Sequence, residues 1–230
     1  MKRFYKQASV IDAEGGFGIV LDGRPVRTPG RAALTVPTRA LADAITCEWM
    51  EQGDDIDPRV MRFTGLSNAA IDRIAPDASG FAAGLSIYGE SDLLCYRAEG
   101  PAPLVARQTD AWDPLLDWAA NRYDIVFAVA TGIIHTPQPA ATLERLAAAT
   151  RARSAFHLAG LSPLVTITGS LVAALALAEG AVSADAVWQA VTVDERWQAE
   201  QWGEDALALQ AQEARRAEFM AAARFLALLG

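Results

Sequence analysis

The chain has 230 residues, of which 52% are hydrophobic and 21% charged, a balance typical of a folded globular protein rather than a disordered one. Its formal net charge of −8 excludes a general nucleic-acid binder, which needs a basic stripe. The acidity is concentrated in residues 81–230, which carry ten basic and seventeen acidic side chains. This asymmetry favours a basic partner surface.

The first 36 residues predict a small antiparallel sheet. Apolar and β-branched segments are separated there by two turn signals, one at Gly15-Gly16 and one at Asp22-Gly23. We expect Thr38 to cap a helix that ends at Gly53 and buries a stripe of Leu41, Ile45 and Trp49.

Shorter helices are predicted at 64–75 and 78–88, and residues 92–97 favour a strand or a buried extended segment. The Pro-Ala-Pro at 101–103 then separates the two halves of the chain. Beyond it, residues 125–133 could form a strand or a loop. The remaining pattern predicts helices at 104–123, 140–158, 162–179, 183–202 and 204–228.

These elements indicate an α+β protein with a small antiparallel-sheet N-terminal domain over residues 1–100 and an all-α C-terminal domain over 101–230. The uncharged segment 158–178 is long enough to span a bilayer, but polar residues dilute its first half. A buried central helix is therefore favoured, and a membrane-associated assembly protein that uses residues 161–178 is a rival interpretation.

The sequence lacks the usual patterns of catalysis and cofactor binding. His135 and His157 have no metal-ligand spacing, and no glycine-rich segment is followed by the residues of a phosphate-binding loop. We therefore expect no metal, no cofactor and no catalysis. Cys47 and Cys95 lack CxxC spacing, which favours burial and a reducing compartment. A small-molecule enzyme with a Cys95–His135 or carboxylate site between the domains is the alternative.

The segment 188–205, WQAVTVDERWQAEQWGED, places a carboxylate where a helix should be apolar. In one continuous helix, Glu195 shares a stripe with Trp188 and Trp202, whereas Trp197 lies opposite and is expected to anchor the helix. A buried carboxylate is costly unless it is paired. Glu195 therefore has an internal partner such as Arg215 or Arg224, lines a cavity, or contacts a partner protein.

Seven motifs in order carry a resemblance to a known family. They are KRFYK (2–6), LDGRPVRTP (21–29), Glu48-Trp49, AID (70–72), DLLCYR (92–97), WDPLLDW (112–118) and DERWQAEQWGED (194–205). The series resembles the assembly chaperones for the soluble catalytic head of F-type ATP synthase. Within them it is similar to the mitochondrial and alphaproteobacterial branch dedicated to the alpha subunit.

The resemblance implies a non-catalytic, ATP-independent chaperone that holds the free alpha subunit until it pairs with beta. It ties function to the acidic position at Glu195, or at Asp194 if the register shifts by one. The partner-binding residues expected on this basis are Asp194, Glu195, Gln198, Trp202 and Asp205. Trp49 is interpreted as structural.

We further expect a monomer when free, with no stable membrane insertion. The start at KRFYK favours the bacterial cytoplasm, whereas related proteins reside in the mitochondrial matrix.

Overall fold

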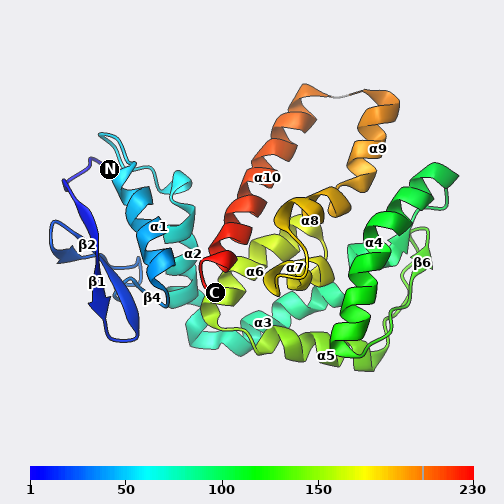
Figure 1. The fold of residues 1–230 in the computed structure, drawn as a ribbon, viewed down its shortest axis with the longest axis horizontal. Helices are drawn as coiled ribbons and strands as arrows, with labels where there is room; N and C mark the ends of the chain where they lie inside the picture. Colours follow the sequence, from blue (N-terminus) through cyan, green and yellow to red (C-terminus); the bar gives the residue numbers. More distant parts are fainter. Residues whose placement is uncertain (204) are drawn as a thin grey trace. The chain divides into compact units, whose positions relative to one another are not determined.

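The computed structural model describes residues 1–203 and 205–230, and the chain divides into two compact units (Figure 1). Unit 1 comprises Met1–Phe81, Arg153–Gly160 and Arg224–Gly230. Unit 2 comprises Ala82–Ala152 and Leu161–Ala223. The predicted α+β class is confirmed, because a small N-terminal antiparallel sheet is followed by a chain that is mostly helical. The boundary predicted at residue 100 stays a prediction.

Strand β2 (Gly16–Leu21) is the centre of the N-terminal sheet. It pairs antiparallel with β1 (Ala8–Ala13), β3 (Arg24–Pro25) and β4 (Thr35–Val36). The β1–β2 register joins Ala13 to Gly16, so the predicted glycine turn closes the hairpin. Gly16 has a φ of +149°, and a Cβ there would collide with the carbonyl oxygen of Val36. The turn therefore requires glycine.

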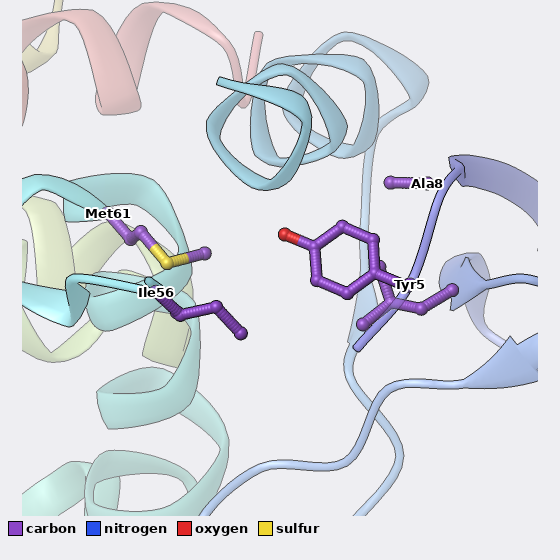
Figure 2. Close-up of a cluster of buried hydrophobic side chains, with 5 residues drawn as sticks. Tyr5, Ala8, Ile56 and Met61 are labelled. Atoms are coloured by element: carbon purple, nitrogen blue, oxygen red, sulfur yellow. The ribbon is translucent and has the colours of Figure 1, made fainter. Parts of the chain in front are cut away.

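Helix α1 (Arg39–Met50) begins as predicted, because the Thr38 hydroxyl accepts a hydrogen bond from the Leu41 amide at 3.2 Å. Leu41 and Ile45 are fully buried, but Trp49 is only half-buried. Trp49 packs on the cluster drawn in Figure 2, where Tyr5 lies between Ala8 and the pair Ile56 and Met61. The Tyr5 hydroxyl donates to the Trp49 carbonyl at 2.6 Å, which fixes the N-terminal segment against α1.

Unit 1 is mostly helical from Pro58 to Phe81, and both shorter helices predicted over 64–75 and 78–88 are present. The elements are a 3₁₀ turn (Pro58–Val60), α2 (Arg62–Ala69), a π-helical turn (Ala70–Ile74), a second 3₁₀ turn (Ala75–Asp77) and the start of α3 (Ala78–Ser86). Asp72 on the π turn accepts hydrogen bonds from the Thr28 hydroxyl and the Gly30 amide, both at 2.7 Å. This contact holds the loop after β3 in place.

Unit 2 is predominantly helical. Its elements are a 3₁₀ turn (Ile87–Gly89), a 3₁₀ turn (Leu93–Cys95), β5 (Tyr96–Arg97), α4 (Ala102–Tyr123), β6 (Ala130–Thr131), α5 (Ala140–Arg151), most of α6 (Ala155–Thr168), α7 (Leu171–Ala178), α8 (Ala184–Val191), α9 (Val193–Trp202) and most of α10 (Ala206–Ala227). Helix α4 continues through Pro114, and β5 pairs in parallel with β6. The segment predicted as strand or loop at 125–133 is mostly loop.

The single helix predicted over 162–179 is wrong. Gly169 adopts a φ of +67° and ends α6, and the Ser170 hydroxyl then caps α7 by accepting from the Ala173 amide at 2.9 Å. The prediction of one continuous helix over 140–158 is also wrong, because that helix, α5, ends at Arg151. Among the described residues, no helix is long and apolar enough to cross a membrane.

A buried carboxylate joins the segment before β5 to α7. Asp92 is fully buried and accepts hydrogen bonds from the amides of Leu94 at 3.1 Å and Val172 at 2.9 Å. Burial nevertheless raises the pKa of Asp92 to about 6, because the amide donors do not fully replace water. Asp92 is therefore a structural acid in the core of unit 2.

The helix predicted over 183–202 is also interrupted. Thr192 leaves helical geometry at φ −104° and ψ 16°, and its hydroxyl donates to the Trp188 carbonyl at 2.7 Å. A side chain that bonds its own backbone in this way competes with the helical ladder. The break separates α8 from α9 and changes the direction of every side chain after it. Trp188 and Glu195 therefore do not share one buried stripe.

Candidate functional site

An open groove of about 530 Å³ runs between α9 and α10, which form the helical hairpin at the top of Figure 1. The α9 wall consists of Glu195, Gln198, Ala199 and Trp202, spaced by three, four and seven residues, so they share one helix face. The remaining lining residues are Gly203, Asp205, Ala208, Leu209, Ala211, Gln212 and Arg215. Four of the five predicted partner-binding residues therefore lie together: Glu195, Gln198, Trp202 and Asp205.

Glu195 bridges the two walls of this groove. Its carboxylate accepts hydrogen bonds from Arg215 at 2.7 and 2.8 Å and from the Gln212 amide group at 3.1 Å. The predicted pairing with Arg215 is confirmed. The alternative partner is wrong, because Arg224 lies over the Phe63 ring in unit 1.

The expectation that Glu195 sits in a core helix is also wrong. The Glu195 and Arg215 side chains are 43% and 45% exposed. The break at Thr192 is the reason, because it turns the Glu195 face of α9 toward solvent instead of the core of unit 2.

The hairpin exposes apolar surface that a free protein would ordinarily bury. Trp202 is 78% exposed and Leu207 is 75% exposed. Within α10, no residue from 206 to 218 is buried. Asp205 adds a carboxylate at the tip, where it accepts from the Leu207 amide at 3.3 Å. An exposed aromatic beside carboxylates is typical of a protein-binding surface.

Asp194 does not line the groove. Its carboxylate accepts a hydrogen bond at 2.7 Å from the amide group of Gln108 on α4, and the Gln108 oxygen accepts from the Ala98 amide at 2.8 Å. Gln108 is buried at 2% exposure, so Asp194 positions the start of α9. The sequence analysis missed Gln108. The signal was its place four residues before Trp112 on the buried stripe of α4.

A third set of contacts holds the side of α9 that faces away from the groove. The Arg107 guanidinium of α4 lies 4.9 Å from the Trp197 ring centroid and pairs with Glu200 at 2.7 Å. Trp197 is half-buried and thus contacts α4, in keeping with its predicted anchoring role. Helix α9 is held on its α4 side, whereas its other face lines the groove.

The residues considered for catalysis have structural surroundings. Burial raises the pKa of the Cys95 thiol to about 12, which suppresses the nucleophilic thiolate near neutral pH. Cys47 is exposed, contrary to its predicted burial. The His135 ring lies 3.1 Å from the Tyr96 hydroxyl and 3.2 Å from Glu90. Across residues 1–203 and 205–230, no group of three or more potential metal ligands is found.

Comparisons with known proteins show what this chain is similar to. A profile of the ATP12 chaperone protein family matches residues 2–120. Two solved structures of Atp12 from Paracoccus denitrificans, one with an Asp-to-Lys substitution, superpose with a TM-score of 0.95 at 39% identity, covering 100% of this chain and 98% of theirs. The Atu1473 protein of Agrobacterium tumefaciens, described as a candidate chaperone, gives a TM-score of 0.95 at 43% identity, covering 100% of this chain and 86% of its own.

Proposed function

Because this chain belongs to the ATP12 chaperone family, we propose that it binds the free alpha subunit of F-type ATP synthase and prevents its aggregation until alpha pairs with beta. The observation that carries the proposal is the α9–α10 groove. It combines exposed Trp202 with two carboxylates, those of Glu195 and Asp205, on a surface of the hairpin that is open to solvent. The expected binding residues are Glu195, Gln198, Trp202 and Asp205, with Asp194 in a positioning role.

The lining residues are proposed to have different roles, which follow from their chemistry. Burying the indole of Trp202 removes a large apolar area from water, and this supplies affinity. The carboxylate of Glu195 contributes orientation and selectivity, because an apolar partner without a matching donor would leave the charge desolvated. An assembly surface that is apolar with basic residues satisfies both requirements, and a newly made subunit exposes such surface before it pairs.

Release is proposed to need no ATP. The sequence has no phosphate-binding loop, and the groove can be vacated by competition if beta binds an overlapping surface on alpha more tightly. The same proposal gives the chain no catalytic activity, a monomeric free state and residence in the bacterial cytoplasm. The bacterial sources of the similar structures support the last point.

The test is gel filtration of the full chain with purified alpha subunit, scored by co-elution and by suppression of alpha aggregation. We expect co-elution that is lost when beta is added. Glu195→Lys should weaken binding at least tenfold, because it places a cation beside Arg215 and repels a basic partner. Glu213→Lys is the matched control, since Glu213 is exposed on α10 but does not line the groove.

Two outcomes would contradict the proposal. Absence of any complex with wild-type chain, together with unchanged aggregation of alpha, would refute the assignment of alpha as partner. Equal binding by a correctly folded Glu195→Lys variant and by wild type would remove the groove from the interface.

A further inference from the structure

We propose that the α9–α10 groove accepts a basic amphipathic α-helix of the partner, and that Arg215 is a placeholder that a basic side chain of this helix displaces from Glu195. The inference rests on the proposed chaperone function and specifies the partner segment and the exchange that admits it. The starting observation is that α9 and α10 run side by side as a hairpin, yet an exposed ion pair, and not apolar packing, joins them across the groove.

The shape of the groove favours a helix as its occupant. One face of α9 and one face of α10 form its two walls, and the residues on each face recur at helical spacing. Small side chains, those of Ala199, Ala208 and Ala211, lie among the lining residues and let a third backbone approach closely. Helix α9 has 10 residues and so spans about 15 Å, enough for an occupant of about three turns.

The hairpin has a physical reason to accept a third helix. The α10 residues 206–218 include none that is buried, and Val193 is the buried residue of α9. Most helical stability in proteins comes from packing one face, and short unsupported helices are marginal in water. A partner helix would give both exposed faces a common core. The occupant is therefore expected to have its own apolar face, which would cover Trp202 and Leu209.

Charge identifies the polar part of the occupant. Residues 193–218 contain seven acidic and three basic side chains, so the hairpin attracts a basic segment. Glu195 lies near one end of the groove and Asp205 near the other. The rise from residue 195 to residue 202 is about 10 Å along α9, which corresponds to about two helical turns. We expect the partner helix to carry two basic residues about two turns apart.

Arg215 is suited to leave Glu195 when that helix binds. The pair is nearly half exposed on both sides, and exposed ion pairs contribute at most about 1 kcal/mol. A basic residue of the partner can replace Arg215 on the carboxylate, after which the Arg215 guanidinium returns to water. An uncharged helix would cover Glu195 without replacing its donors, which is unfavourable. The exchange therefore requires that any helix bound in the groove carry a basic residue that can pair with Glu195.

The deciding experiment compares the affinity of purified alpha subunit for the wild-type chain and for Arg215→Ala. Because alpha no longer has to displace the arginine, the variant should bind about two- to fivefold more tightly. Glu195→Gln should bind more weakly, and adding Arg215→Ala to it should give no gain. Arg216→Ala is the matched control, since Arg216 pairs with Asp185 at 2.9 Å outside the groove.

Steric variants test the occupancy of the groove itself. Ala208→Trp fills the groove and should abolish binding, whereas Ala214→Trp puts the same side chain on an exposed α10 position outside the groove and should bind normally. Short overlapping peptides of alpha test the helix. A basic peptide that gains helical circular dichroism with wild type but not with Ala208→Trp would support the proposal, and binding only by uncharged or non-helical peptides would overturn it.

The results separate the inference from the function on which it rests. Failure of alpha to bind the wild-type chain refutes the proposed function. Binding by wild type with equal or weaker binding by Arg215→Ala overturns the placeholder role alone, because it makes Arg215 neutral or a direct contact. Equal binding by Ala208→Trp and Ala214→Trp overturns the groove as the docking site.

Discussion

Two carboxylates on helices, Glu48 in unit 1 and Glu195 in unit 2, have opposite environments. Glu48 is buried at 9% exposure, and its oxygens accept from the amides of Phe63 at 2.6 Å and Thr64 at 2.8 Å and from the Thr64 hydroxyl at 2.8 Å. It thereby caps α2, whose own N-cap residue, Met61, makes no side-chain cap bond. Glu195 is exposed, and its partners are two long side chains at the surface.

The difference shows that a glutamate can stabilise the fold in one region and be available to bind a partner protein in the other. Rigid backbone amides surround Glu48, so no external group can replace them without unfolding α2. The partners of Glu195 are mobile side chains that solvent or a bound protein can replace. Burial also raises the pKa of Glu48, whereas the backbone and hydroxyl donors of Phe63 and Thr64 act in the opposite direction.

The largest expected effect distinguishes Trp188 in the core of unit 2 from Trp202 on the α9–α10 hairpin. Trp188 is 5% exposed and lies 5.4 Å from the buried Phe219 ring, whereas Trp202 is 78% exposed. Trp188→Ala should lower the free energy of unfolding by about 3–5 kcal/mol because it leaves a cavity. Trp202→Ala should change it by less than about 0.5 kcal/mol and weaken partner binding instead. Urea denaturation and alpha binding measure the two effects.

Equal destabilisation by the two substitutions would contradict the comparison, because it would mean that the hairpin is packed in the free protein. Loss of alpha binding in Trp188→Ala at a temperature where the variant is still folded would place the core of unit 2 in the interface. Neither result is expected from the exposures of the two indoles.

Removal of the α2 cap should have the next largest effect. Glu48→Ala leaves the amides of Phe63 and Thr64 without their acceptor, and each unsatisfied buried donor costs about 1–3 kcal/mol. We expect a total loss of about 3 kcal/mol in the free energy of unfolding, measured by urea denaturation. Glu51→Ala, three residues further along the chain and exposed, is the control and should be near neutral. Equal unfolding midpoints for the two variants would refute the capping role.

The pH dependence of stability extends the comparison to a third carboxylate, that of Asp92. The pKa of Asp92 is about 6 in the fold against 3.8 for the free side chain, so the folded state holds the proton more tightly. Its contribution to stability is therefore full below about pH 4 and is lost as pH rises to about 6, by about 2–3 kcal/mol. Asp92→Asn should lack this dependence.

The measurement for Asp92 is the difference in unfolding free energy between wild type and Asp92→Asn across this pH range. Contributions from Glu48, whose pKa is also raised, are common to both proteins and cancel in the difference. A constant difference from pH 4 to pH 7 would show that folding does not raise the pKa of Asp92.

The sequence was most informative where local chemistry decides the structure. The glycine turn at Gly16, the Thr38 cap and the stripe through Leu41 and Ile45 are set by residues close together in the chain, and all are present. The partner-binding role of Asp194, Glu195, Gln198, Trp202 and Asp205 stays a prediction, and the structure shows only that four of the five line one groove. The turn, the cap and the stripe could be predicted because each depends on residues that lie within about two helical turns of one another in the sequence.

The errors arise where one residue alters the path of the backbone. Thr192 and Gly169 each interrupt an apolar pattern that otherwise continues. Hydrophobic periodicity alone registers neither the Thr192 hydroxyl that bonds its own backbone nor the positive φ of Gly169. The break at Thr192 is why Glu195 is exposed instead of buried. The role of Asp194 could not be predicted either, because its partner Gln108 is 86 residues away in the sequence.

The smallest expected effect concerns the ion pair of Glu195 and Arg215 in the free protein. A double-mutant cycle with Glu195→Ala and Arg215→Ala should give a coupling of no more than about 1 kcal/mol in the free energy of unfolding, because both side chains are nearly half exposed. High salt should reduce the coupling further by screening. A coupling above about 2 kcal/mol that persists in salt would mean that the pair holds the hairpin together. Displacing Arg215 would then cost too much free energy for a partner to replace it. A small coupling would mean that Glu195 can exchange its partners, whereas Glu48 cannot.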